Sequence, residues 1–217
     1  MGRAFTGLSA TDRALLPARC AACVFWESEQ RLPLECGAAC DSALAAVWSR
    51  DVVDQWGEFG RVVIEDGELL GFIKYAPARY FPQARLLPSG PAEPDVPLIT
   101  CMHIAPEARR RGLGGVLLRS ALRDLSQRGE RRVQAFALAS RVDLSLAPMV
   151  GVEFLLRHGF HAVRAHPVTP LLELDLKTLV TWTENLESVL ESLRIPVRVP
   201  RQAPVTLAQG GDSPGGR

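Results

Sequence analysis

A short loop rich in arginine and glycine has the residue types needed to hold an anionic group. Residues 109–115 read RRRGLGG, and they follow an apolar run at 98–104 that is stopped by Pro106. After the loop, apolar residues recur at helical spacing from Leu117 to Leu125, so the stretch predicts a strand, a loop and a helix. Glycines allow close approach of the backbone, and the free N–H groups and dipole of a helix N-terminus favour a phosphate group.

Two other phosphate-binding loops do not fit these residues. A Walker loop requires GxxxxGK followed by Ser or Thr, and no lysine follows these glycines. A dinucleotide-binding loop requires GxGxxG, and its third glycine would fall at Leu117. The spacing therefore indicates a different phosphate-bearing ligand.

The loop resembles the acetyl-CoA-binding loop of the GNAT superfamily of N-acetyltransferases. That family's pattern is Arg or Gln, two residues, Gly, one residue, and Gly or Ala, and Arg109, Gly112 and Gly114 fill it. Pro106-Glu107 lies where the family commonly has Pro-Glu. The resemblance implies an α+β fold, with a mixed, mostly antiparallel sheet flanked by helices on both faces. It also implies acetyl-CoA as co-substrate, with its pyrophosphate on the backbone N–H groups of the loop.

The resemblance further implies how the acetyl group is held. In the GNAT fold, the strands expected at 98–104 and 133–138 diverge, and the pantetheine arm of the cofactor fills the gap. The predicted cofactor-binding residues are Met102, His103, Ile104, Arg109, Arg110, Arg111, Gly112, Leu113, Gly114 and Gly115. The expected activity is that of an acyltransferase, in which a primary amine attacks the thioester directly in a ternary complex.

The sequence departs from the family where a proton donor is expected. Many members carry a tyrosine four residues before the glycine of a Gly-Phe pair; here the pair is Gly159-Phe160, and the position holds Leu155. Leucine cannot protonate the leaving thiolate. Another acid, an unassisted thiolate and a loss of catalysis all remain open.

Three residues are catalytic candidates, and for two of them a purely structural role is an alternative. Tyr80 lies on a proline-rich segment, where it could simply anchor a loop. His103 lies on the strand expected at 98–104, but the two-residue period turns it away from Met102, as expected of a packed histidine. Glu58 is the third candidate. The carboxylates that could border the amine site are Glu27, Glu58 and Asp95.

Four cysteines near the N-terminus form a second group of chemically capable residues. Their spacing is C-x2-C-x12-C-x3-C, and four thiolates could bind a structural zinc ion, although the second half departs from the usual ribbon spacing. The alternative is a set of small buried cysteines, so no metal is expected. The run CAACVFWE at 20–27 also resembles the CxxCxFWE run of a poorly characterised bacterial GNAT subgroup. The candidate metal ligands are Cys20, Cys23, Cys36 and Cys40.

The chain is long enough for one domain with its own core. We expect a single GNAT-like domain over residues 1–200, with its core at about 55–176 and a first strand at 3–8. The hydrophobic pattern predicts mostly helix at 9–56, a hairpin at 61–75 turning at Asp66-Gly67, and a long proline-rich loop at 76–97 that cannot sit inside a sheet. The remaining predicted elements are helices at 114–128, 147–158 and 178–194, strands at 133–138, 160–165 and 170–176, and a disordered tail at 201–217.

Composition limits the partners and the location. A formal net charge of +1, with no wider basic stripe, argues against nucleic acid as a ligand, and no apolar run approaches the length of a membrane span. The chain begins without an apolar leader, so a cytoplasmic location is expected. The expected partner is a small-molecule or peptide amine, and the oligomeric state is open. Two other classes stay open: a non-catalytic acyl-CoA-binding protein, because of Leu155, and a zinc-bearing interaction module, because of the cysteines.

Overall fold

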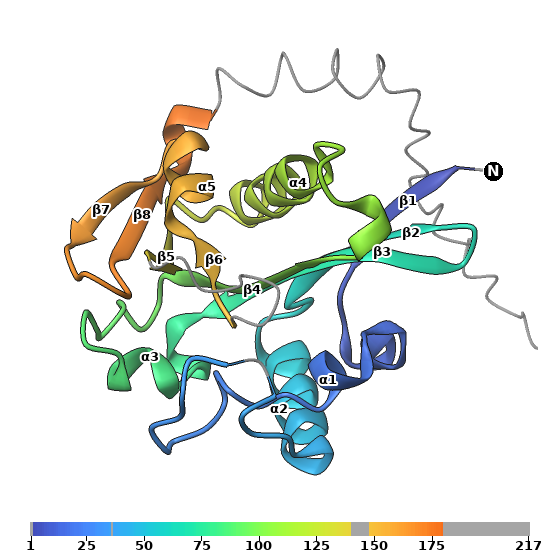
Figure 1. The fold of residues 1–217 in the computed structure, drawn as a ribbon, viewed down its shortest axis with the longest axis horizontal. Helices are drawn as coiled ribbons and strands as arrows, with labels where there is room; N and C mark the ends of the chain where they lie inside the picture. The colour runs from blue at the N-terminus through green and yellow to red at the C-terminus, as the bar shows by residue number, and fades with distance from the viewer. Residues whose placement is uncertain (1, 36, 140–147, 180–217) are drawn as a thin grey trace, which may run out of the picture.

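One mixed sheet organises the computed structural model, which describes residues 2–35, 37–139 and 148–179 (Figure 1). The strand order in the described part is β1-β2-β3-β4-β5-β8-β7, and the short β6 pairs with β5. The strands are β1 Arg3–Gly7, β2 Gly60–Glu65, β3 Glu68–Pro77, β4 Pro97–Ile104, β5 Arg132–Leu138, β6 Val150–Gly151, β7 His161–Arg164 and β8 Leu171–Asp175. The α-helices are α1 Ala18–Ala21, α2 Ser42–Gln55, α3 Gln83–Leu86, α4 Leu113–Gln127 and α5 Val152–Arg157, and the 3-10 turns are η1 Ala10–Leu15, η2 Ala78–Tyr80, η3 Pro106–Ala108 and η4 Leu176–Leu179.

Helices cover both faces of the sheet. In Figure 1, α4 and α5 lie on one face, and α1 and α2 lie on the other. Among the described strands, five pairs are antiparallel, and only β4–β5 and β5–β6 are parallel. The α+β class, with a mixed and mostly antiparallel sheet between helices, is therefore confirmed. No helix in the described ranges is both long and apolar enough to cross a membrane.

The sheet packs against a different cluster of side chains on each face. Trp26, Trp48, Phe81 and Phe136 belong to the cluster on the α2 face, where Trp26 stacks on Phe136 with ring centroids 6.1 Å apart. On the α4 face, the leucines of α4 pack with Leu155 and strand residues. Fully burying one large apolar side chain contributes about 1.5–3 kcal/mol, so both layers stabilise the position of β4 between them.

Helix α4 forms and ends as its sequence predicts. Its buried positions follow the helical period, from Leu117 to Leu125. The helix stops at Gly129, whose φ of 84° lies in the left-handed region that glycine tolerates. Its N–H bonds to Ser126, and the Glu130 N–H bonds to the Leu125 carbonyl, which is the Schellman arrangement.

Strands β4 and β5 pair only briefly before they diverge. The register joins Leu98 to Gln134 and Ile99 to Ala135, and no further pair is formed. Beyond this point the end of β5 pairs instead with β6, through Ala137 and Val150. The expected divergence of the two strands is therefore present, and it begins at Thr100.

The N-terminal region is less helical than its composition suggests. Helix is limited to η1, α1 and α2 within the predicted range 9–56, and the chain between α1 and α2 is largely irregular, with one bridge joining Cys23 and Cys40. The reason is tertiary packing, because Phe25 and Trp26 are drawn fully into the core. The first strand and the hairpin with its Asp66-Gly67 turn are confirmed.

Two other expected boundaries are wrong. Strand β3 runs to Pro77 and β4 starts at Pro97, and these prolines face each other in the ladder; the segment between them contains η2 and α3. Prolines are tolerated there because they lie at strand ends. The helix expected at 147–158 is only Val152–Arg157, since residues 150–151 are used as a strand beside β5. The expected helix at 178–194 and the tail at 201–217 lie almost entirely outside the described residues.

Candidate active site

The loop before α4 presents unpaired backbone donors. Arg110 and Gly112 have positive φ values of 60° and 77°, and Gly112 is the residue that caps the helix. The first helical N–H groups, those of Leu113 and Gly114, have no hydrogen-bond partner within the described part of the chain. The helix N-terminus is thus open to an anion, as the glycine pattern predicts.

A cavity of about 770 Å³ lies beside this loop, and we call it the α4 cavity. Among the described residues, its lining carries Arg109, Arg110 and Arg157 and no acidic side chain, so the cavity is suited to a polyanion. The lining residues are Met102, Ile104, Ala108, Arg109, Arg110, Gly112, Leu113, Gly114, Gly115, Met149, Val150, Gly151, Phe154 and Arg157. Eight of the ten predicted cofactor residues are among them; the other two, His103 and Arg111, are not.

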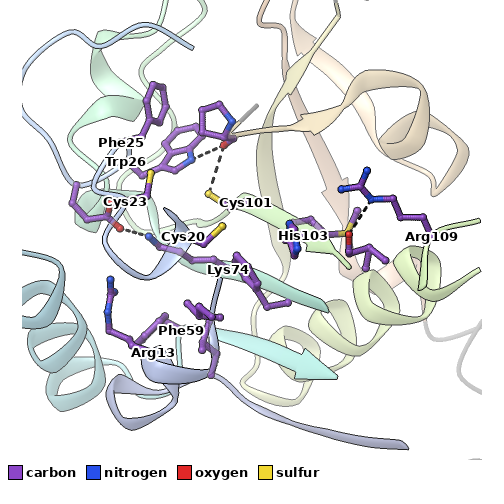
Figure 2. A pocket seen from close by; sticks show the side chains of 17 residues that line it. Arg13, Cys20, Cys23, Phe25, Trp26, Phe59, Lys74, Cys101, His103 and Arg109 are labelled. Carbon is purple, nitrogen blue, oxygen red and sulfur yellow. Dashed lines mark hydrogen bonds and ion pairs between the residues drawn. The ribbon is translucent and has the colours of Figure 1, made fainter. Parts of the chain in front are cut away.

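A second cavity, of about 320 Å³, lies on the opposite face of β4, and we call it the α1 cavity. Figure 2 shows side chains from the N-terminal segment and from β3 and β4 converging on this space. Met102, Ile104 and Arg109 line both cavities, so the two spaces meet at the outer half of β4, beyond its last pair with β5. The lining residues are Leu8, Arg13, Leu16, Cys20, Cys23, Phe25, Trp26, Glu27, Phe59, Phe72, Lys74, Cys101, Met102, His103, Ile104, Arg109 and Pro148.

A bulge in β4 sets which of its side chains face the α1 cavity. The register pairs Ile73 with Met102 and Tyr75 with Ile99, so two β4 residues, Thr100 and Cys101, lie opposite the single residue Lys74. Such an extra residue shifts the alternation of the strand. Cys101 therefore lines the α1 cavity together with His103.

A buried ion pair joins the N-terminal segment to β3 in the α1 cavity. Lys74 Nζ donates to Glu27 Oε1, and the two side chains are 11% and 2% exposed. The ammonium also lies 4.4 Å from the centre of the Trp48 ring, a cation–π contact. Glu27 Oε2 is buried and has no hydrogen-bond partner within the described residues.

His103 faces the α1 cavity from β4. Its ring stacks on Phe72, with centroids 5.8 Å apart, on the face of the sheet away from α4. Burial lowers its pKa below the ordinary value, and the positive charges of Arg109 and Arg19 lower that pKa further. A neutral imidazole is thus favoured at neutral pH.

The structure does not bring the other catalytic candidates to either cavity. The Tyr80 hydroxyl donates to Gln55 Oε1 at 3.0 Å, which ties its loop to α2. Glu58 pairs with Arg61 at 3.5 Å, and Asp95 pairs with Arg79 at 2.5 Å. These side chains are engaged by neighbours on the surface, and none of them lines a cavity described above.

Neither tyrosine of the chain replaces the residue missing at Leu155. Leu155 is fully buried in the core beside α4. The Tyr75 hydroxyl donates to Asp124 Oδ2 at 2.7 Å, and burial, with the Asp124 charge, raises its pKa above the ordinary range. Together with the position of Tyr80, this leaves no tyrosine hydroxyl in the lining of the two cavities.

The cysteines do not gather into a metal site in the described part of the chain. Cys20 and Cys23 line the α1 cavity, whereas Cys40 is exposed, and no group of three or more His, Cys, Asp or Glu side chains is arranged to hold a metal among the described residues. Cys36 lies outside those residues. The zinc-site hypothesis therefore gains no support here.

Sequence reasoning overlooked Lys74, Arg13 and Cys101 as site residues. A usable signal existed for Lys74, because it is one of only two lysines and interrupts the apolar run of β3. Lysine is rarely buried unless it is paired, so a partner carboxylate was to be expected.

Comparisons with known proteins agree with this architecture. The model of the acetyltransferase (GNAT) family matches residues 25–146, which is more than half of the chain. A search of curated proteins found no match. The match does not reach Cys20 or Cys23, so membership of a subgroup with the CxxCxFWE run stays a prediction.

Two solved structures show the same fold at low identity, and a third structure is similar to this chain. An acetyltransferase of the GNAT family from Streptococcus pneumoniae is 14% identical, with a TM-score of 0.53 over 80% of this chain and 98% of that chain. An N-acetyltransferase from Staphylococcus aureus Mu50 is 15% identical, with a TM-score of 0.52 over 81% and 99%. A GNAT family acetyltransferase from Brucella melitensis, solved in complex with acetyl-CoA, is 18% identical, with a TM-score of 0.45 over 80% and 87%.

Proposed function

Because the chain belongs to the GNAT acetyltransferase family, we propose that it moves an acetyl group from acetyl-CoA to a primary amine by direct attack in a ternary complex. The observation that carries this proposal is the meeting of two cavities at the outer half of β4, where Met102, Ile104 and Arg109 line both. One cavity is positive and opens on a helix N-terminus, and the other is lined mainly by apolar side chains around a buried ion pair. Two ligands held on either side of one strand can react without a covalent enzyme intermediate.

The α4 cavity is the proposed site of acetyl-CoA. The N–H groups of Leu113 and Gly114 would bind the pyrophosphate, with Arg109 and Arg110 adding positive charge. Arg109 Nε donates to the Ile104 carbonyl at 3.0 Å, which fixes the guanidinium at the junction of the two cavities. Arg111, which was also predicted to bind the cofactor, is not among the described residues that line this cavity.

The divergence of β4 from β5 is the proposed position of the pantetheine arm and the acetyl group. Beyond Ile99, the β4 edge that faces β5 forms no further ladder pair with it. Backbone N–H groups of residues 102–104 on this edge could bind the acetyl carbonyl and stabilise the negative charge that develops on its oxygen. Such preorganised donors are commonly the largest single contribution in acyl transfer.

The leaving thiolate does not require a protein acid in this proposal. An ordinary thiol has a pKa of about 8.5, so a thiolate is a competent leaving group near neutral pH. This accounts for a site whose Tyr position holds the buried Leu155. The cytoplasmic location expected from the sequence is part of the same proposal.

A second function is favoured by that same leucine: binding of an acyl-CoA without transfer. Both functions predict binding of coenzyme A, but only the transferase predicts release of its thiol in the presence of an amine. Calorimetric titration with coenzyme A, followed by a thiol-release assay with acetyl-CoA and a set of amines, separates them. Saturable binding with amine-dependent thiol release supports the transferase, binding without release favours the second function, and no binding at millimolar coenzyme A overturns both.

A further inference from the structure

One buried carboxylate oxygen in the α1 cavity has no hydrogen-bond donor. Glu27 is 2% exposed at its side chain, and its Oε1 is occupied by Lys74. Its Oε2 is buried and without a partner in the described part of the protein, although the residue lines the cavity. Buried polar atoms in folded proteins are nearly always hydrogen-bonded to protein or to ordered water, so this oxygen is available to a donor that a ligand supplies.

The ion pair holds this oxygen beside the reaction centre proposed above. The backbone carbonyl of Lys74 accepts a hydrogen bond from Thr100 Oγ1 at 3.1 Å. Thr100 is the first β4 residue past the last pair with β5, and with Cys101 it forms the bulge opposite Lys74. The pair is therefore anchored at the level where the strands diverge, on the face of the sheet opposite the α4 cavity.

The walls of the α1 cavity are mainly aromatic and aliphatic. Phe25, Trp26 and Phe59, which are labelled in Figure 2, line this cavity together with Leu8 and Phe72. A volume of about 320 Å³ is at the lower end of ordinary small-molecule sites. The cavity is therefore matched to a small molecule with an apolar body.

Charge limits the ligand further. Within the described part of the chain, the lining carries the basic side chains of Arg13, Lys74 and Arg109 against one carboxylate, that of Glu27. One ammonium can be neutralised at Glu27 Oε2, but a second positive charge on the ligand would face the excess of cations. Like-charge contacts within a protein cavity are more unfavourable than in bulk water.

We propose that the α1 cavity binds a small apolar primary monoamine whose nitrogen donates to Glu27 Oε2, and that Glu27 is the catalytic base. This inference rests on the proposed acetyl transfer. Lys74 is a positioning residue, because it fixes the carboxylate through Oε1 and is itself fixed over Trp48.

The proton balance of the step is simple. The amine enters as an ammonium and gives one proton to Glu27 Oε2. The neutral nitrogen then forms the N–C bond to the acetyl carbon as the C–S bond breaks. The second proton of the nitrogen passes to the coenzyme A sulfur, and Glu27 returns its proton to solvent, so the products are the amide, the free thiol and one proton.

The first test replaces Glu27 with glutamine, which keeps the shape and the oxygen that binds Lys74 but cannot take a proton. We expect Glu27→Gln to lower kcat with phenethylamine by about 100-fold, the lower end of the usual range for a general base, while the Kd for coenzyme A stays unchanged. The matched control is Glu65→Gln, a surface carboxylate paired with Arg3, which should keep wild-type kcat. An unchanged kcat in Glu27→Gln would overturn the proposal.

A second variant guards against a folding defect in the first. Glu27→Asp keeps the charge opposite Lys74 but withdraws the carboxylate by one methylene, so we expect a fall in kcat of at least about tenfold with coenzyme A affinity retained. A wild-type kcat in Glu27→Asp would overturn the role of Glu27 even if Glu27→Gln does not fold.

The third measurement tests the ligand class. We expect kcat/KM for phenethylamine to exceed that for spermidine, or for a short peptide with one lysine, by at least about tenfold. A preference for spermidine or for the peptide would overturn the assignment.

A binding measurement distinguishes failure of the amine-site proposal from failure of the proposed acetyl transfer. If no amine is acetylated, calorimetry with phenethylamine in the presence of coenzyme A decides: wild-type binding that is lost in Glu27→Gln supports the amine site, and no binding overturns it.

Discussion

The two cavities on either side of β4 are built in opposite ways. The ligand-binding part of the α4 cavity comes mostly from consecutive residues at 109–115, and its donors are backbone N–H groups. The α1 cavity is assembled from segments as distant as Leu8 and Pro148, and its chemistry depends on side chains. A site built from local backbone leaves a motif in the sequence, whereas one assembled from scattered side chains does not.

The largest expected effect concerns the buried pair of the α1 cavity. Lys74→Met leaves the Glu27 carboxylate buried without its partner, which typically costs 3–5 kcal/mol, so we expect a loss of stability of about 4 kcal/mol. Urea denaturation measures this directly. The double variant Lys74→Met with Glu27→Gln removes both charges and should be more stable than Lys74→Met alone; a double variant that is less stable would show that the pair is not coupled.

The next effect concerns the α4 cavity. Gly112→Asp places a carboxylate at the proposed pyrophosphate site, and a like-charge contact near a protein surface is worth up to about 4 kcal/mol, so we expect coenzyme A affinity to fall by about 100-fold. Gly129→Asp is the matched control, because Gly129 has a similar φ of 84° and open space around it at the other end of α4. Calorimetry should show near wild-type affinity for the control, and equal losses in both variants would assign the effect to backbone strain.

A smaller effect tests the buried tyrosine outside both cavities. Tyr75→Phe removes the hydrogen bond to Asp124, and a buried hydrogen bond to a charged group contributes about 1.5–3 kcal/mol, so we expect a stability loss of about 2 kcal/mol. The acetylation rate should not change, because the hydroxyl does not line either cavity. A large drop in kcat at unchanged coenzyme A affinity would instead indicate that Tyr75 takes part in catalysis.

The smallest effect is the pH dependence of stability caused by His103. Its pKa is lowered in the folded state, so the unfolded chain binds the proton more readily, and stability falls as pH drops below the ordinary value of about 6.5. Unfolding of His103→Gln, measured between about pH 7.5 and pH 5.5, should show a weaker loss toward acid than the wild type. The exposed His161 offers the control substitution His161→Gln, which should keep the wild-type slope.

The α4 cavity could be predicted from the sequence in more detail than the α1 cavity. Gly112 and Gly114 predicted the α4 N-terminus because a positive φ and unhindered backbone donors need those residue types at that place. The strand period predicted the face of His103, but the bulge at Thr100 and Cys101 was not foreseen, since one extra residue in a strand leaves no hydrophobic signature.

The path of the N-terminal segment also could not be predicted from the sequence. Its alanines and leucines suggested helix, but the burial of Trp26 against Phe136 decided an irregular path. That path brings Glu27 to Lys74, 47 residues away in the chain. Contacts of this kind depend on the whole fold, so Glu27 could be named only as one carboxylate among several.

The shared wall formed by Met102, Ile104 and Arg109 has a practical consequence. Because the two spaces adjoin the same three residues, we expect a conjugate that tethers coenzyme A to an apolar amine through a short linker to occupy both at once. Because the second half would then bind at a high effective concentration, the conjugate should be held far more tightly than either half. It offers a way to trap the protein with both of its ligands in place.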